Sequence, residues 1–204
     1  MIELIIFDLD GVLAHTEPIH FGTLCHAINH VAGIPYADIT KIIRIDGSTT
    51  KNKLAILRNI FNWNDDIVDR IENMKQTDVV QEFVNMQSTP EQIEMLSVLS
   101  KDYRLAIGSN ARKRSVDTVV DAMQIRHFFE CVIAIDDVGI PKPDPAIFNY
   151  IMQIMNVDPI NTLIIEDSPR GIQAARASYA NVLITSCVEE TTLEYIQTAI
   201  SRIP

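Results

Sequence analysis

Basic residues are scarce in this sequence: 17 Lys and Arg stand against 27 Asp and Glu, which gives a formal charge of −10. A protein this acidic repels a nucleic-acid backbone and an anionic lipid surface at long range, so we expect neither nucleic acid nor a membrane as a partner. The acidity does not exclude a phosphorylated substrate. One metal ion and one or two lysines are enough to reverse the field within a single pocket.

Cysteine is also sparse, and long apolar runs are missing. Cys25, Cys131 and Cys187 are odd in number and far apart, which indicates free thiols in a reducing compartment. No stretch approaches the ~18 apolar residues that a membrane span needs. The apolar start of the chain is interrupted by Glu3 and Asp8 and has no basic n-region, so it is not typical of a signal peptide. We therefore expect a cytoplasmic protein.

Short apolar runs are the most regular feature that the sequence does contain. Each is apolar at every position, which is typical of strands buried on both faces of a parallel sheet. The runs are residues 4–7, 105–107, 132–135, 163–165 and 182–184.

Segments with helical spacing separate the later runs. They are residues 112–123, 144–155 and 168–179. The last two open with Asp144-Pro145 and Ser168-Pro169, each an N-cap candidate followed by proline at the first helical position. Strands and helices in alternation predict right-handed βαβ crossovers. The predicted fold is thus an α/β fold with a doubly wound, Rossmann-like parallel sheet.

The stretch between the first run and residue 88 departs from this alternation. It contains no convincing strand, and its apolar residues recur at helical spacing. We therefore predict two domains. Residues 1–14 and 89–204 form an α/β core, and residues 15–88 form an inserted all-helical cap.

Two acidic pairs directly follow predicted strands. Asp8 and Asp10 come after the first strand, and Glu166 and Asp167 come after the strand at 163–165. Ligands in open α/β sheets bind outside the carboxyl ends of the strands, so both pairs are expected at one edge. Carboxylate oxygens suit Mg²⁺, which relieves their mutual repulsion. Taken singly, each pair is also explained as an acidic turn or as acids beside a helix N-terminus.

Further polar residues are expected at the same edge. Ser109 and Asn110 follow a strand and lead into a helix, where Ser109 and backbone N–H groups are suited to bind phosphate oxygens. Taken by itself, Ser109 is more simply explained as a helix cap. Lys142 lies between two prolines that restrict its backbone, although a single loop lysine is ordinarily a solvated surface charge.

The order of these parts is more specific than any one of them. Asp-x-Asp-Gly, Ser-Asn, Lys-Pro-Asp-Pro and Glu-Asp-Ser-Pro-x-Gly follow one another along the chain. This order strongly resembles the haloacid dehalogenase-like superfamily, and it looks closest to the branch containing β-phosphoglucomutase and small-metabolite phosphatases. The resemblance covers nearly the whole chain, and the insertion at 15–88 is similar to that family's helical cap.

The resemblance implies roles for the core residues. Asp8 is implied to be the nucleophile that forms an aspartyl phosphate. Asp10 is implied to protonate the leaving oxygen and then to activate water. Ser109, Asn110 and Lys142 are implied to bind the phosphoryl group, with Lys142 also easing repulsion between Asp8 and the incoming anion.

The resemblance also implies a cofactor. Mg²⁺ is expected to be held by Asp8, the backbone carbonyl of Asp10 and Asp167, with Glu166 as a ligand or an outer partner. Similar dehalogenases and phosphonate-cleaving relatives lack an aspartate at the second position, so Asp10 favours phosphate-ester chemistry.

Cap residues are expected to select the substrate. Thr16 and His20 lie near the crossing from core to cap, and Arg44 is a further substrate-facing candidate. The chain departs from its relatives at two flanking positions: His15 stands where Asp is frequent, and Gly108 stands where Thr or Ser is common. Both departures leave the substrate open.

Three functions remain open from the sequence. The leading one is a phosphatase that acts on a small phosphorylated metabolite, in a monomer or weak dimer. A phosphomutase of the β-phosphoglucomutase type needs the same core residues. A non-catalytic binding protein on the same fold is the third, and the intact motifs argue against it.

Overall fold

The computed structural model describes residues 1–43 and 49–203, and the chain divides into two compact units. We call residues 1–15 together with 86–204 the α/β unit, and residues 16–85 the helical unit. Each unit is described by itself.

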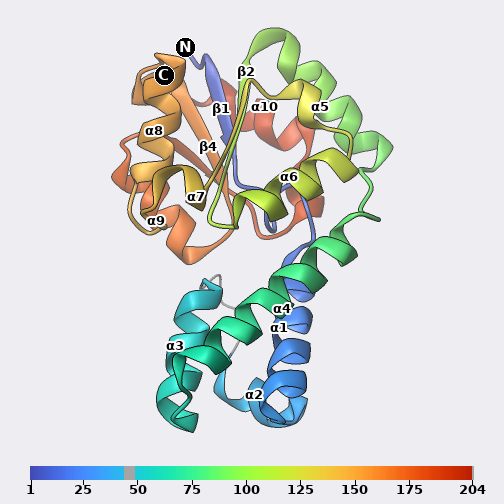
Figure 1. Ribbon diagram of the computed structural model, residues 1–204. Helices are drawn as coiled ribbons and strands as arrows, with labels where there is room; N and C mark the ends of the chain where they lie inside the picture. The colour runs from blue at the N-terminus through green and yellow to red at the C-terminus, as the bar shows by residue number, and fades with distance from the viewer. Residues whose placement is uncertain (44–48, 204) are drawn as a thin grey trace. The chain divides into compact units, whose positions relative to one another are not determined.

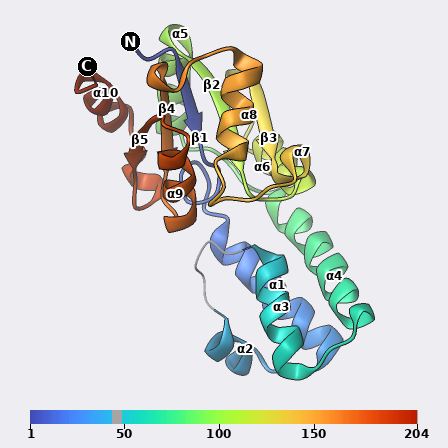
Figure 2. The same ribbon diagram turned by 90° about the vertical axis from the view of Figure 1, so that its left-hand side faces the viewer.

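The α/β unit contains a five-stranded sheet in the order β3-β2-β1-β4-β5, and every neighbouring pair is parallel (Figures 1 and 2). The strands are β1 (Leu4–Phe7), β2 (Arg104–Ser109), β3 (Cys131–Ala134), β4 (Thr162–Glu166) and β5 (Asn181–Ile184). All residues of β1 and β4 are buried, as their apolar runs predict. The predicted doubly wound α/β fold is confirmed.

Helices cover both faces of this sheet. Figure 2 shows α8 and α9 on one face and α5 and α6 on the other. Leu4, Ile6 and Ile164 face the first pair and form a core with Phe148 and Ile151 of α8. The helical segments of the unit are α5 (Pro90–Asp102), α6 (Lys113–Ala122), η1 (Arg126–Phe128), α7 (Ile135–Val138), α8 (Ala146–Met155), η2 (Pro159–Asn161), α9 (Pro169–Ala177), η3 (Val188–Glu190) and α10 (Leu193–Ser201).

The two expected helix caps differ in outcome. Ser168 is the N-cap of α9, and its Oγ accepts a hydrogen bond from the N–H of Gly171 at 3.1 Å. Asp144 was expected to cap α8, but that helix begins at Ala146 with Pro145 as its N-cap. The carboxylate of Asp144 instead accepts from the Ala146 N–H at 2.9 Å, which fixes the turn before the helix.

In its described residues, 16–43 and 49–85, the helical unit consists of four helices around an apolar core. They are α1 (Glu17–Ala32), α2 (Tyr36–Ile42), α3 (Thr50–Phe61) and α4 (Asp65–Phe83). Helices α1 and α4 lie along one another in both views (Figures 1 and 2). Leu24, Ile28 and Ile71 are fully or almost fully buried between them.

Across residues 1–43 and 49–203, no helix has both the length and the apolar content to cross a bilayer.

Candidate active site

The register of the sheet sets the site. Phe7 pairs with Ile107 of β2 and with Ile165 of β4, so the residues that follow lie at the same height. The N–H of Asp8 donates to the carbonyl of Ile165 at 3.0 Å, which keeps Asp8 in line with the sheet. Asp8 and Glu166 are thereby side by side at the carboxyl edge, although 158 residues separate them in the chain.

Lys142 is the centre of this edge. Its Nζ donates to Asp8 Oδ1 at 2.6 Å, to Glu166 Oε1 at 2.6 Å and to the carbonyl of Gly108 at 2.8 Å. It also lies 4.7 Å from the centroid of the Phe148 ring, a cation–π distance. Lys142 is 2% exposed, so the sequence-based alternative of a solvated surface lysine is wrong.

The buried charged groups shift one another's pKa values. Burial raises the pKa of Asp8 above its usual value; Lys142 opposes that rise, and the charges of Glu166, Asp10 and Asp167 add to it. Burial also disfavours charge on Lys142, but the charges of Asp8 and Glu166 and their hydrogen bonds outweigh it and raise the pKa of the lysine. The Asp8 carboxylate therefore interacts with three other carboxylates and one ammonium, which leaves surplus negative charge around it.

Asp10 lies beyond the end of β1 in a tight loop. The N–H of Gly11 donates to the carbonyl of Ala14 at 2.8 Å, and Gly11 has φ +84°. Asp10 Oδ2 accepts the hydroxyl of Ser109 at 3.0 Å. The same Oγ accepts the N–H of Ala111 at 3.0 Å, so a fully buried serine links the first and second motifs.

Asn110 binds the lysine loop. Its Oδ1 accepts the backbone N–H of Lys142 at 2.9 Å. The side chain expected to contact phosphate is thus engaged with the protein backbone, and it connects the end of β2 to the segment that carries Lys142.

Gly108 is explained by the packing of α8. A Cβ at this position would lie 2.9 Å from Cδ1 of Ile151 and 3.6 Å from the Phe148 ring. Thr or Ser at this position would push the end of the Ile151 side chain aside, so glycine lets α8 pack closely against β2. This close approach places Phe148 beneath the Lys142 ammonium.

The carboxylates fit a hard divalent cation. Asp8, Glu166 and Asp167 each offer an oxygen, and these oxygens lie within 4.8 Å of one another. Gly11 makes room for Asp167, since a Cβ there would lie 2.1 Å from its Oδ2. The surplus negative charge is also what such a cation neutralises. The oxygen-only donor set is the one that Mg²⁺ prefers.

Glu166 has its carboxylate oxygens already engaged. Oε1 accepts from Lys142, and Oε2 accepts from the N–H of Asp167 and from the N–H and hydroxyl of Ser168 at 3.1–3.2 Å. Any contribution of Glu166 to a cation uses an oxygen that also accepts a hydrogen bond. Gly171 is required beside it, because a Cβ there would come within 1.8 Å of Glu166 Oε1.

The cap candidates lie in the helical unit or outside the described residues. Thr16 is fully buried at the N-cap of α1. His20 Nδ1 lies 3.0 Å from Nζ of Lys75, and its ring packs edge-on against Phe83. Arg44 falls within 44–48, outside the described part of the chain.

The sequence analysis did not identify Lys75 as a buried charged residue of the helical unit. This lysine is 5% exposed and belongs to the buried column Ile71, Lys75, Val79 and Phe83 of α4. A lone charged residue at the i+4 spacing of an apolar column was the available signal.

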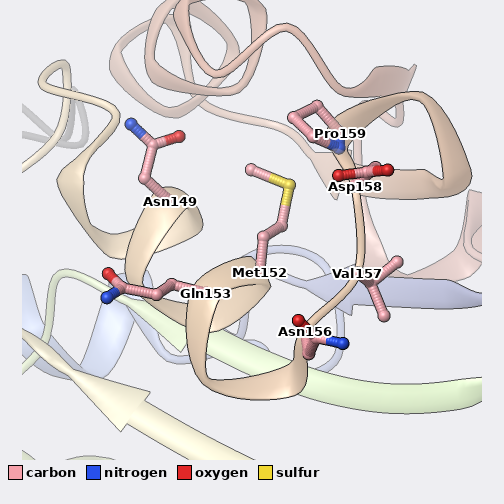
Figure 3. A pocket seen from close by; sticks show the side chains of 7 residues that line it. All are labelled: Asn149, Met152, Gln153, Asn156, Val157, Asp158 and Pro159. Atoms are coloured by element: carbon pink, nitrogen blue, oxygen red, sulfur yellow. The ribbon is translucent and has the colours of Figure 1, made fainter.

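A pocket of ≈ 430 Å³ lies at the opposite edge of the α/β unit (Figure 3). It is formed by the end of α8 and the segment leading to β4, with lining residues Asn149, Met152, Gln153, Asn156, Val157, Asp158 and Pro159. None of these seven carries a positive charge, and one is acidic. The pocket therefore does not suit a phosphate group.

Comparison with known proteins agrees with this geometry. The sequence profile of the haloacid dehalogenase-like hydrolase family matches residues 5–185. Fructose-1-phosphate phosphatase YqaB of Escherichia coli is 29% identical over 178 residues, covering 85% of this chain and 91% of its own. A phosphorylated carbohydrates phosphatase of Thermotoga maritima is 31% identical over 187 residues, covering 86% and 81%.

Solved structures show the same fold. A β-phosphoglucomutase from Clostridium difficile superimposes with a TM-score of 0.79 at 22% identity, covering 98% of both chains. The chain belongs to the haloacid dehalogenase-like hydrolase family and is an enzyme of its phosphatase branch. The family resemblance expected from the order of the motifs is confirmed.

Proposed function

We propose that this enzyme removes phosphate from a phosphorylated sugar or a similar small metabolite through an aspartyl phosphate on Asp8, with Mg²⁺ as cofactor. The observation that carries the proposal is the Lys142 ammonium held between Asp8 and Glu166, 2.6 Å from each. A nucleophilic carboxylate beside a buried cation is suited to attack an anionic phosphoryl group. The two relatives named as phosphatases of phosphorylated sugars support the substrate class.

Each core residue has a task that its position supports. Lys142 orients Asp8 and offsets part of the repulsion between this carboxylate and the phosphate. Ser109 fixes Asp10 through its hydroxyl, at a place where Asp10 can deliver a proton to the leaving oxygen and later take one from water. Bound Mg²⁺ would neutralise phosphoryl oxygens, and Asp8, Asp167 and the Asp10 carbonyl are the proposed ligands, with Glu166 as ligand or outer partner.

The alternative hypothesis, a phosphomutase of the β-phosphoglucomutase type, receives less support. Relatives that are 29% and 31% identical carry phosphatase names, whereas the β-phosphoglucomutase likeness at 22% identity concerns the fold. The helical unit is proposed to act as the cap, with Thr16, His20 and Arg44 as substrate-selecting candidates. The three free thiols support a cytoplasmic location, and we keep a monomer or weak dimer as the proposed state, to be measured by light scattering.

The test is phosphate release from a panel of sugar phosphates, nucleotides and phosphoglycolate, with and without Mg²⁺. Asp8→Asn removes the nucleophile at nearly constant shape, and we expect a loss of at least about 10³-fold. Asp158→Asn, an exposed aspartate at the opposite edge, is the matched control and should change little. Release that survives in Asp8→Asn refutes the proposed nucleophile. Transfer from a sugar bisphosphate to a sugar without net release would identify the mutase instead.

A further inference from the structure

Arg170 holds the main chain of Lys142. Its Nε and Nη2 donate to the carbonyl oxygen of Lys142 at 3.2 and 2.8 Å. The backbone N–H of Lys142 donates to Asn110 Oδ1 at 2.9 Å. The side chains of Arg170 in α9 and of Asn110 in the loop after β2 therefore bind both backbone polar groups of the lysine, and Asn110 Nδ2 makes a longer contact of 3.5 Å to the same carbonyl oxygen.

The lysine segment needs such support. Pro141 and Pro143 flank Lys142 and have no N–H group, so the neighbouring backbone offers few donors to anchor this segment. The lysine side chain is a flexible four-carbon stem, and its ammonium must lie within hydrogen-bond distance of both Asp8 and Glu166. A fixed main chain reduces the conformations open to that stem.

The local helix does not explain Arg170. It lies in the first turn of α9, where the helix dipole disfavours a positive charge. A residue that opposes its local preference but makes two hydrogen bonds to a distant segment is typical of a functional site. Arg170 also follows Glu166 by only four positions, so one short segment supplies both a carboxylate to the Lys142 ammonium and an anchor to its carbonyl.

We propose that Arg170 is a positioning residue: it acts through Lys142 by keeping the ammonium in place for Asp8 and for the phosphoryl group. The inference rests on the proposed phosphatase function and adds a residue to it. Displacing a reacting group by about 1 Å costs on the order of 10²-fold in rate, so a contact to the main chain is sufficient to matter.

The first experiment compares Arg170→Met with Arg176→Met. Arg176 lies on the same helix and is exposed, so it controls for a change of charge and of helix composition. We expect Arg170→Met to lower kcat by about 10- to 100-fold with KM changed by less than about threefold. Arg176→Met should leave both values unchanged. Arg170→Lys, which retains a donor, should recover part of the lost kcat.

The second experiment asks whether Arg170 acts through Lys142. In a Lys142→Ala background, Arg170→Met should lower kcat no further, because the group that it positions is already absent. An equal fold loss in both backgrounds overturns the proposal. So does a raised KM with unchanged kcat, which would assign Arg170 to substrate binding, or a response no larger than that of Arg176→Met.

A readout without turnover separates this proposal from the proposed function. In protein labelled with ¹⁵N-lysine, the buried Lys142 ammonium signal is identified by its loss in Lys142→Ala, or in Lys142→Arg if the alanine variant does not fold. We expect Arg170→Met to shift or broaden this signal and Arg176→Met to leave it in place. If the wild-type protein releases no phosphate but the signal responds, the phosphatase function fails and the positioning contact stands. An unchanged signal in Arg170→Met overturns the contact itself.

Discussion

The two edges of the sheet carry the same kinds of charge in opposite surroundings. At the carboxyl edge, the Lys142 side chain is 3% exposed and lies 2.6 Å from two carboxylates. At the amino edge, Arg104 at the start of β2 pairs with Glu130 just before β3, and these side chains are 41% and 50% exposed. Arg104 also donates to the carbonyl of Met155 at 2.6 Å.

The difference in burial separates a pair that contributes slightly to stability from a cluster that we propose to be catalytic. An exposed ion pair costs little to form and stabilises little. A buried pair loses hydration that its attraction seldom repays, so its presence is weak evidence for a stabilising role. The amino-edge pair connects the start of β2 to the start of β3, whereas the carboxyl-edge cluster is retained at an energetic cost that the proposed catalysis would explain.

The largest difference in stability between the two edges is expected when the cation is removed from each. Lys142→Met leaves Asp8 and Glu166 buried without their partner, and we expect the free energy of unfolding to fall by about 3–5 kcal/mol without Mg²⁺. Arg104→Met should cost about 1 kcal/mol or less. Urea unfolding at pH 7 measures both, and similar losses at the two edges would contradict the distinction drawn here.

The second test adds an atom at the carboxyl edge. Gly171→Ala places a Cβ against the Glu166 carboxylate, so we expect a loss of about 1–3 kcal/mol. Gly22→Ala is the matched control, because a Cβ at this position in α1 meets nothing within 4 Å. There alanine should stabilise the helix by up to about 1 kcal/mol. Thermal unfolding of both variants measures these changes in stability. An unchanged stability of Gly171→Ala would show that the Glu166 side chain moves aside easily.

A smaller effect is expected from pH at the amino edge. Hydrogen bonds and the charge of Arg104 lower the pKa of Glu130, so this pair stabilises the fold above the unfolded pKa and ceases to do so as pH falls through the folded value. Glu130→Gln should cost at most about 1 kcal/mol at pH 7. The difference from wild type should vanish well below about pH 4.3. A difference that persists at pH 3 would mean that packing, not charge, stabilises this contact.

The smallest effect concerns the neighbouring thiol. Burial raises the pKa of Cys131 to about 11, with Glu130 adding to the rise. Wild-type Cys131 should therefore react slowly with alkylating reagents at pH 8. Glu130→Gln should speed its alkylation by less than about tenfold, because burial remains. Mass spectrometry of the modified residue over time measures the rate; slower alkylation in the variant would contradict the assigned charge effect.

The sequence predicted the strands, and the sheet edge at which the two acidic pairs lie, more reliably than it predicted the side-chain contacts there. Fully apolar runs located β1 and β4, since a strand buried on both faces has little other choice. Asp8 and Glu166 were expected at one edge because each directly follows a predicted strand. The side-chain contact of Asn110 could not be read, because Ser-Asn before a helix fits phosphate binding and loop anchoring equally.

Two further errors of the sequence analysis have different causes, one a long-range contact and the other a local sequence pattern. Arg170 stands at the unspecified position of Glu-Asp-Ser-Pro-x-Gly, and only the fold reveals that it contacts Lys142. The start of α8 was placed at Asp144 because Asp followed by Pro imitates a helix cap. A sequence signal for α5 did exist: Thr89 and Gln92 form a reciprocal capping box around Pro90.

The strand order sets a timetable for synthesis. β1 lies between β2 and β4, so Leu4 waits for Arg104 and Thr162 before it has both neighbours. At about 5–20 residues per second, the first partner emerges roughly 5–20 s after β1 and the second roughly 3–12 s later. Until β2 has emerged, the four consecutive apolar residues of β1 have no strand of this sheet to pair with. The segment that bears the proposed nucleophile is thus an apolar part of the nascent chain that a chaperone has reason to cover.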